Sequence, residues 1–510
     1  MAQDAWGYRA RSARATACVV LPLALLCAAG QPQAAVVATQ GGFAGIYAFG
    51  APYRRRARVV AGLGLALAAA MGLGSLVAPH TWAVVLAGAL LAAVAAAACL
   101  VLRVGPPREY FIVFTFLIAT ALPVDAGAAA GRTALVLLGA AGAWLISMAG
   151  TLRDTRGPER TAIVSALRAV ARLLDAIGRP GAPAARHEAV LAVAGAHEAV
   201  ADAGWPGTAG GGELARRAEA AEALLEAALA LLVEGSPPLD PAWGRAVQAL
   251  AEGAWAAPVM PVMAARPPVP AAARLDAALR TAGTAGRLDT PPAAGEVADV
   301  PRWRVVLADL TDLRSPAPAA ALRLGVAVAV ASTVGLLVRA EHPTWIPLSA
   351  AAVLQGTNIA LARQRAVHRA AGTAVGVVVV AGVLALGPGR ASLVVLVAVF
   401  QALTEALVLV VYGVAVVAIT CLSLLLLEIA GVGTSVHGLL DARLLDTALG
   451  CAIGVAAGLA VWPRGSRVRL AGVQARAIRA AASALRAVLA GAPEPERRRR
   501  RRAVHVAVVG

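Results

Sequence analysis

Long apolar runs constrain the fold of this chain more than any other feature of the sequence. Residues 59–77, 81–102 and 393–430 form such runs, and they contain few charged side chains. A helix needs about 17 to 25 residues to cross about 30 Å of hydrocarbon, so the third run is long enough for two passes. Charged residues make up only 15% of the chain, against about 25% in ordinary soluble proteins. The sequence therefore predicts an all-α membrane protein embedded in a lipid bilayer.

The positive charge of the chain is concentrated beside these apolar runs. The net charge is +17, yet residues 151–315 hold 17 arginines against 19 acidic residues. The excess therefore flanks the apolar runs, where arginine is a topology signal and not the mark of a nucleic-acid site. We expect no nucleic-acid partner.

The sequence carries no pattern of an enzyme or of a cofactor site. It has no Walker A motif and no Gly-x-Gly-x-x-Gly after a strand. His187 and His197 lie ten residues apart, which is wrong for a helical metal pair, and the five cysteines lie in apolar runs without metal-ligand spacing. We therefore expect neither an enzyme nor a bound metal or cofactor, and any pumping must be driven by an ion gradient or by partner subunits.

The two ends of the chain repeat one another at an offset of 311 residues, at which the apolar runs superpose without a gap. An even number of spans in each repeat makes the repeats parallel, related by an axis along the membrane normal. The identical pairs at this offset include Pro32 with Pro343, Arg58 with Arg369, Arg132 with Arg443 and Gly139 with Gly450. The expected spans are 15–30, 33–50, 58–77, 81–102, 108–124 and 131–149, then 320–338, 343–361, 368–386, 391–411, 413–430 and 442–462.

This repeat divides the chain into four parts. They are an N-terminal membrane repeat (1–150), a cytoplasmic helical insert (151–315), a C-terminal membrane repeat (316–463) and a basic cytoplasmic tail (464–510). Helical patterning in the insert covers 159–178, 185–204 and 213–235, which predicts a helical bundle. The tail is expected to face solvent or anionic lipid.

Arginines indicate the orientation of the spans. Clusters such as Arg54, Arg55 and Arg56 fall on one side of the predicted topology, and the positive-inside rule makes this side cytoplasmic. Both termini are then cytoplasmic, as expected for a protein of the inner or plasma membrane. Residues 9–29 also resemble a secretory signal peptide, but a first repeat that begins near residue 15 favours an uncleaved span.

The C-terminal repeat resembles the fusaric acid resistance (FUSC) family of membrane transporters. The resemblance lies in "HPTWIPLSAAAVLQGTNIALARQRAVHRAAGTAVG" and "RLLDTALGCAIGVAAGLAVWP", and "GPPREYFIVFTFLIAT" in the first half is also similar to this family. It implies efflux of aromatic or other organic acids across the cytoplasmic membrane. The first half departs from the pattern at Ala34, Ala61 and Gly62. The positions that fit are Trp345, Arg369, Gly372, Thr373, Gly376, Arg443, Asp446, Thr447, Gly450, Trp462 and Pro463.

Charged and polar residues inside the spans are the candidates for a transport pathway. An unpaired charge at the bilayer centre costs at least about 2.5 kcal/mol, which makes Glu405 the most informative one. Gln401 and Thr404 lie beside it. A protonatable site, a cross-helix ion pair or an incidental residue that faces a pore would each explain it. Asp446 has an intrahelical partner in Arg443 at i, i+3.

Arg369 is expected at the inner end of its span and Arg443 at the outer end, as interface anchors or as contacts for an anionic substrate. Gly372, Thr373 and Gly376 form a small-residue face for close helix packing.

We therefore expect a transporter that exports small organic anions, with aromatic carboxylic acids favoured and the proton gradient as driving force. An anion channel resembling the plant aluminium-activated malate transporters and a non-transporting membrane scaffold are the alternatives. The sequence leaves open whether the chain forms a homo-oligomer.

Overall fold

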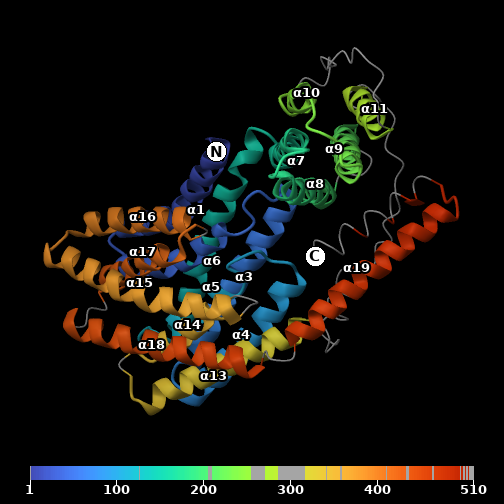
Figure 1. Ribbon diagram of the computed structural model, residues 1–510. Helices are drawn as coiled ribbons and strands as arrows, with labels where there is room; N and C mark the ends of the chain where they lie inside the picture. The colour runs from blue at the N-terminus through green and yellow to red at the C-terminus, as the bar shows by residue number, and fades with distance from the viewer. Residues whose placement is uncertain are drawn as a thin grey trace. The chain divides into compact units, whose positions relative to one another are not determined.

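The structure of the chain is a computed structural model in which all regular elements of the described residues are helices (Figure 1). It divides into two compact units. The membrane unit comprises residues 1–49, 56–149 and 299–463, and the helical unit comprises 50–55, 150–298 and 464–510. The described residues are 2–125, 127–204, 209–253, 270–284, 316–340, 342–355, 359–408, 410–431, 436–461, 465–493, 496–497, 500 and 504.

Nine helices among the described residues are long and apolar enough to cross a membrane, which confirms the prediction of a multi-pass membrane protein. Of these helices, α1 and α3 belong to the first half of the chain, and α13 is the first membrane helix of the second half. The membrane unit contains α1 (Ala2–Ala28), α2 (Pro32–Gly42), η1 (Phe43–Ile46), α3 (Tyr53–Val77), α4 (Thr81–Val101), α5 (Tyr110–Ala121), α6 (Ala128–Met148), α13 (Pro316–Leu337), α14 (Trp345–Val353), α15 (Ile359–Ala385), α16 (Arg390–Leu407), α17 (Tyr412–Ala430) and α18 (Val436–Val461).

Three of the twelve predicted spans are shorter than expected. The prediction of full spans at 33–50, 108–124 and 343–361 is wrong, because α2, α5 and α14 have 11, 12 and 9 residues. Prolines account for part of this difference, since proline disfavours helix in the residue before it and donates no backbone hydrogen bond. Pro107 precedes α5 and Pro123 follows it, so this helix is closed at both ends. Hydropathy alone could not distinguish such short helices from complete spans.

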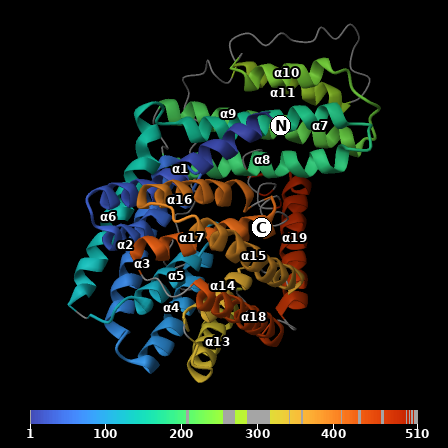
Figure 2. The same cartoon turned by 90° about the vertical axis from the view of Figure 1, so that its left-hand side faces the viewer.

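In the membrane unit, helices of one half pack against helices of the other half (Figure 2). The first helix of each half packs against the fourth helix of the other half, so that α1 contacts α16 and α13 contacts α4. The second helix of each half packs against the fifth helix of the other half, so that α2 contacts α17 and α14 contacts α5. Each half therefore contributes helices to the packing of the other.

Gly139 and Gly450, which are paired at the offset of 311 residues, occupy matching positions in the packing. A Cβ atom at Gly139 would lie 1.9 Å from the carbonyl oxygen of Ala38 on α2. A Cβ atom at Gly450 would lie 2.3 Å from the carbonyl oxygen of Ile346 and 2.6 Å from Ser349 Cβ on α14. Each glycine thus lets the last helix of its half approach the short second helix closely.

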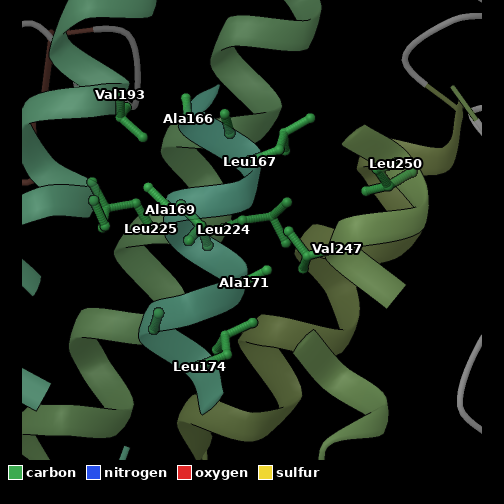
Figure 3. Packing of buried hydrophobic residues seen from close by; sticks show 14 of the residues in the cluster. Ala166, Leu167, Ala169, Ala171, Leu174, Val193, Leu224, Leu225, Val247 and Leu250 are labelled. Atoms are coloured by element: carbon green, nitrogen blue, oxygen red, sulfur yellow. The ribbon is translucent and has the colours of Figure 1, made fainter. Parts of the chain in front are cut away.

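The helical unit is a bundle with an apolar core of its own. Leu167 and Leu174 on α7 pack with Leu224 on α9 and Val247 on α10, and all four side chains are buried (Figure 3). The three predicted helices of the insert are confirmed as α7, α8 and α9. The helices of this unit are η2 (Ala149–Leu152, which begins at the boundary), α7 (Gly157–Ala176), α8 (Ala182–Ala203), α9 (Ala209–Val233), α10 (Ala242–Ala251), α11 (Pro270–Thr284) and α19 (Gly465–Leu489).

Candidate anion-binding site in the membrane unit

Arg369 lies on α15 in a buried position between two tyrosines. Its side chain is 5% exposed, and it lies near the side chains of Tyr110 on α5 and Tyr412 on α17. Its Nε atom is buried without a hydrogen-bond partner among the described residues. Because an arginine stays protonated, this site holds a buried cation beside two phenol rings.

Arg443 on α18 lies in the same region. Its guanidinium carbon lies 3.2 Å from the centre of the Trp345 ring, and its Nη2 donates to Ser423 Oγ at 3.4 Å. The side chain is 5% exposed, and its Nε also lacks a hydrogen-bond partner within the described part of the chain. The charge of Asp446 acts on Arg443 favourably, as the predicted i, i+3 spacing requires.

The two arginines are close enough to repel one another, and both interact with Tyr110. That Arg369 lies at the inner end of its span and Arg443 at the outer end stays a prediction. The offset of 311 residues located each arginine along its own helix, but it contained no information on how α15 and α18 pack together. We name Arg369, Arg443, Tyr110, Tyr412 and Trp345 the arginine site.

Sequence reasoning missed the two tyrosines of the arginine site. Tyr110 occurs in "GPPREY", directly before the apolar residues of α5, and Tyr412 is the first residue of α17. A phenol at the start of an apolar helix is a signal for a polar contact at membrane depth, because its hydroxyl usually needs a partner when buried.

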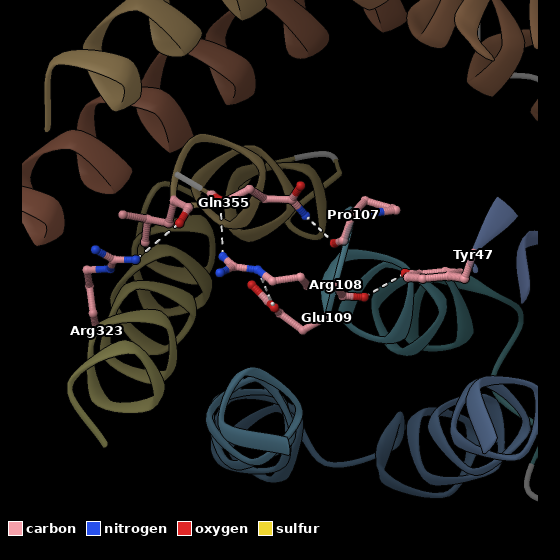
Figure 4. Close-up of polar contacts among 7 residues, drawn as sticks. Tyr47, Pro107, Arg108, Glu109, Arg323 and Gln355 are labelled. Atoms are coloured by element: carbon pink, nitrogen blue, oxygen red, sulfur yellow. Dashed lines mark hydrogen bonds and ion pairs between the residues drawn. The ribbon is translucent and has the colours of Figure 1, made fainter. Parts of the chain in front are cut away.

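The turn before α5 connects this helix to α14 through polar contacts (Figure 4). Arg108 Nη2 donates to the carbonyl oxygen of Gln355 at 3.0 Å, and Gln355 Nε2 donates to the carbonyl oxygen of Pro107 at 2.9 Å. Tyr47 donates its hydroxyl hydrogen to the carbonyl oxygen of Arg108 at 2.6 Å. Arg323 on α13 donates to the carbonyl oxygen of Leu354 at 3.3 Å.

These contacts satisfy backbone groups that the short helices leave open. Inside a bilayer each unsatisfied group costs several kcal/mol, so non-helical backbone is tolerated there only when protein groups cover it. Arg108 has a φ of 46°, which is uncommon for a residue other than glycine and is held in place by the contacts of its side chain and carbonyl group. Tyr110 follows two residues later, so this turn also positions the arginine site.

Glu405 on α16 has a partner on another helix. Arg11 Nη2 on α1 lies 3.3 Å from Glu405 Oε2, and the charge of Arg14 also acts on Glu405. The side chains of Arg11 and Glu405 are 17% and 4% exposed. Of the explanations left open by the sequence, the structure contains the cross-helix ion pair.

The neighbours of Glu405 are less distinctive. Gln401 is buried, and its Nε2 has no hydrogen-bond partner in the described residues. Thr404 donates its hydroxyl hydrogen to the carbonyl oxygen of Phe400 in the preceding turn, at 2.8 Å. The six predicted pathway residues thus form two groups, one at the arginine site with Arg369, Arg443 and Asp446, and one at the Arg11–Glu405 pair.

Gly372 and Gly376 face α17 at close range. A Cβ atom at Gly372 would lie 2.7 Å from the carbonyl oxygen of Gly413, and one at Gly376 would lie 2.7 Å from Thr420 Cβ. Thr373 lies between them and is buried. These residues let α15 and α17 pack closely, three residues beyond Arg369.

Acidic, cysteine and histidine side chains do not gather in a metal-binding cluster of three or more in the part of the chain that the structure describes.

Comparison with known proteins identifies the C-terminal half. Residues 326–457 match the family described as "Fusaric acid resistance protein-like". This stretch of the chain is similar to that family. It contains α14 to α17 and the arginines at 369 and 443, so the resemblance seen in the sequence is confirmed.

A relative extends this similarity over most of the chain. The "Uncharacterized membrane protein YvaC" of Bacillus subtilis (strain 168) is 29% identical over 464 residues, which cover 88% of this chain and 72% of that protein. No solved structure matches the chain.

Proposed function

We propose that this protein is a transporter that exports organic anions and binds them at the arginine site. The observation that carries the proposal is the pair of buried guanidinium groups, Arg369 and Arg443, packed among phenol and indole rings. Arg369 and Arg443 together carry one positive charge more than Asp446 offsets. Buried cations in membrane proteins are expensive to maintain, and they mark ion or substrate pathways by default.

The chemistry of the arginine site suits a carboxylate. A guanidinium group binds a carboxylate through two parallel hydrogen bonds, which are stronger than those it makes to a neutral hydroxyl group. A substrate carboxylate can therefore serve as the acceptor for Arg369, whose buried Nε has no hydrogen-bond partner among the described residues. The rings that surround the guanidinium groups offer flat apolar surfaces, which support aromatic carboxylic acids as the favoured substrates.

We infer that the two membrane halves are parallel repeats that move against one another during transport. The reciprocal contacts of α1 with α16 and of α13 with α4 support this arrangement, as do the matching positions of Gly139 and Gly450. Arginines outside the spans, such as Arg153 and Arg156, support a cytoplasmic insert and cytoplasmic termini in the inner or plasma membrane.

Proton coupling is assigned to Glu405. The Arg11–Glu405 ion pair joins α1 of the first half to α16 of the second half. Formation or loss of this ion pair therefore changes how the two halves pack together. A proton on Glu405 would remove the negative charge that holds Arg11 and so weaken the contact. We propose that this step links proton entry to the rearrangement that exposes the arginine site.

Transport of a labelled aromatic carboxylate by the purified protein tests the proposed function. In proteoliposomes with an imposed pH gradient, the wild-type protein is expected to move benzoate, and Arg369→Gln and Arg443→Gln are expected to abolish this movement. Arg363→Gln is the matched control, because Arg363 lies on the same helix and is exposed. Benzoate transport that survives both substitutions in the arginine site would overturn the proposal.

The same vesicles test the role of Glu405. Glu405→Gln keeps the shape and the burial of the side chain but cannot take up a proton, so benzoate transport should no longer respond to the pH gradient. Unchanged proton-dependent transport would exclude Glu405 as the coupling carboxylate. Unitary currents in planar bilayers would indicate an anion channel instead, and a complete lack of transport would favour a scaffold.

A further inference from the structure

A groove on the surface of the membrane unit lies between α15, α16 and α17. Its volume is about 500 Å³. Apart from His368 its lining is apolar, and its walls include Ala371 and Val375 on α15, Leu403 on α16 and Val417 on α17. Val375 and Leu403 are 53% and 42% exposed, so the groove opens outward. All three helices are candidate membrane spans, so we place the opening of the groove on the lipid side.

One end of the groove is cationic and aromatic. His368 lines this end, and its ring lies 6.4 Å from the ring of Tyr412. The guanidinium carbon of Arg365 lies 5.5 Å from the centre of the Tyr412 ring. The side chain of Tyr412 also lies near that of Arg369. Tyr412 therefore stands between the end of the groove and the arginine site.

We propose that this groove takes up the apolar part of an amphiphilic organic anion directly from the lipid, and that its carboxylate meets Arg369 at Tyr412. The inference rests on the proposed function, and it adds a lateral route and a substrate class, namely carboxylates with an extended apolar body. The positive charges of Arg365 and Arg369, which lie beside Tyr412 beyond this end, complement the carboxylate and fix the direction in which such a molecule lies.

The physical reason for a lateral route is that amphiphilic carboxylates concentrate in the bilayer. Their apolar bodies leave water for hydrocarbon, and their carboxylate groups stay at the polar boundary. A ligand in the groove exchanges lipid contacts for contacts with Leu403 and Val417 and gains the hydrogen bonds of a buried arginine. A hydrophilic anion of the same charge gains nothing from the groove.

The test uses decanoate that carries a photoreactive diazirine at its apolar end, with the full chain in phosphatidylcholine nanodiscs. The cross-linked residues, found by mass spectrometry, should lie on the groove faces of α15, α16 and α17, and unlabelled decanoate should compete while citrate should not. Ala371→Trp and Leu403→Trp fill the groove from opposite walls. Each is expected to weaken decanoate binding about tenfold, or by about 1.4 kcal/mol.

Matched controls place the same indole ring outside the groove. Val378 on α15 and Val399 on α16 are 71% and 48% exposed and do not line the groove. Val378→Trp and Val399→Trp should therefore leave decanoate binding unchanged, which also controls for the effect of tryptophan on folding.

Cross-links that avoid the groove, or equal binding in filled and control variants, would overturn the lateral route. Benzoate transport measured on the same preparations separates this failure from that of the proposed function. If benzoate transport still depends on Arg369, the arginine site stands without the groove, and if it does not, the proposed function fails.

Discussion

Substitution of Gly376 by alanine tests the close packing of α15 against α17. The added Cβ would lie 2.7 Å from Thr420 Cβ and 2.9 Å from the carbonyl oxygen of Val417. Ordinary contacts begin at 3.4 Å, so the helices must separate by roughly 0.7 Å or the side chains must shift. Such overpacking typically costs about 1–3 kcal/mol.

Gly382→Ala is the control for this substitution. Gly382 lies on the same helix, and a Cβ atom there would meet nothing within 4 Å. Both variants gain the same helix propensity, about 1 kcal/mol, so the difference between them isolates the steric cost. Gly376→Ala should therefore be less stable than Gly382→Ala by about 1–3 kcal/mol.

The assay is unfolding of the purified protein by a denaturing detergent in mixed micelles, followed by circular dichroism. Because α15 also carries Arg369, the Gly376→Ala variant should lose benzoate transport in parallel with stability, while Gly382→Ala should retain both. Equal stability of the two alanine variants would refute the reasoning, since it would mean that α15 and α17 do not approach as closely as described.

Two further predictions concern other parts of the chain. Arg11→Leu leaves Glu405 buried without its ion-pair partner and should lower the free energy of unfolding by about 3 kcal/mol. This value is the low end of the usual range, because Arg14 remains nearby. The double variant Arg11→Leu/Glu405→Leu should recover most of this loss in the same detergent titration, and no recovery would contradict the pairing. Leu224→Ala removes a fully buried side chain from the helical unit and should destabilise this unit by about 2–5 kcal/mol, seen as faster hydrogen exchange in α7 and α9. Leu191 is exposed, so Leu191→Ala should leave exchange unchanged. Equal exchange in both variants would refute the assignment of the core.

The sequence predicts where the helices form, but it does not predict how far each helix extends across the membrane. Apolar runs predict where α3, α4 and α17 form, because hydrophobicity over about 20 residues is a local property. The short helices α2, α5 and α14 lie in runs of similar hydropathy, and only their ends distinguish them. Those ends depend on contacts with distant residues, such as that of Arg108 with Gln355, which no local pattern contains.

Individual site residues could be predicted from the sequence, but which of them lie together could not. A charge in an apolar run indicates a functional position, and this reasoning found Glu405. The repeat and the resemblance to the fusaric acid resistance family pointed to Arg369 and Arg443 at the ends of their spans. Their partners come from other helices, as Tyr110 does for Arg369 and Arg11 does for Glu405. The exchange of helices between halves brings these partners together, and a repeat in the sequence does not reveal it.

Equilibrium binding of labelled benzoate to the purified protein tests the central claim most directly, because it requires no gradient and no assumption about direction. Benzoate should bind saturably to the wild-type protein and to Arg363→Gln, and this binding should be lost in Arg369→Gln and Arg443→Gln. Binding of equal affinity in all four proteins would contradict the assignment of the anion site to the buried arginines.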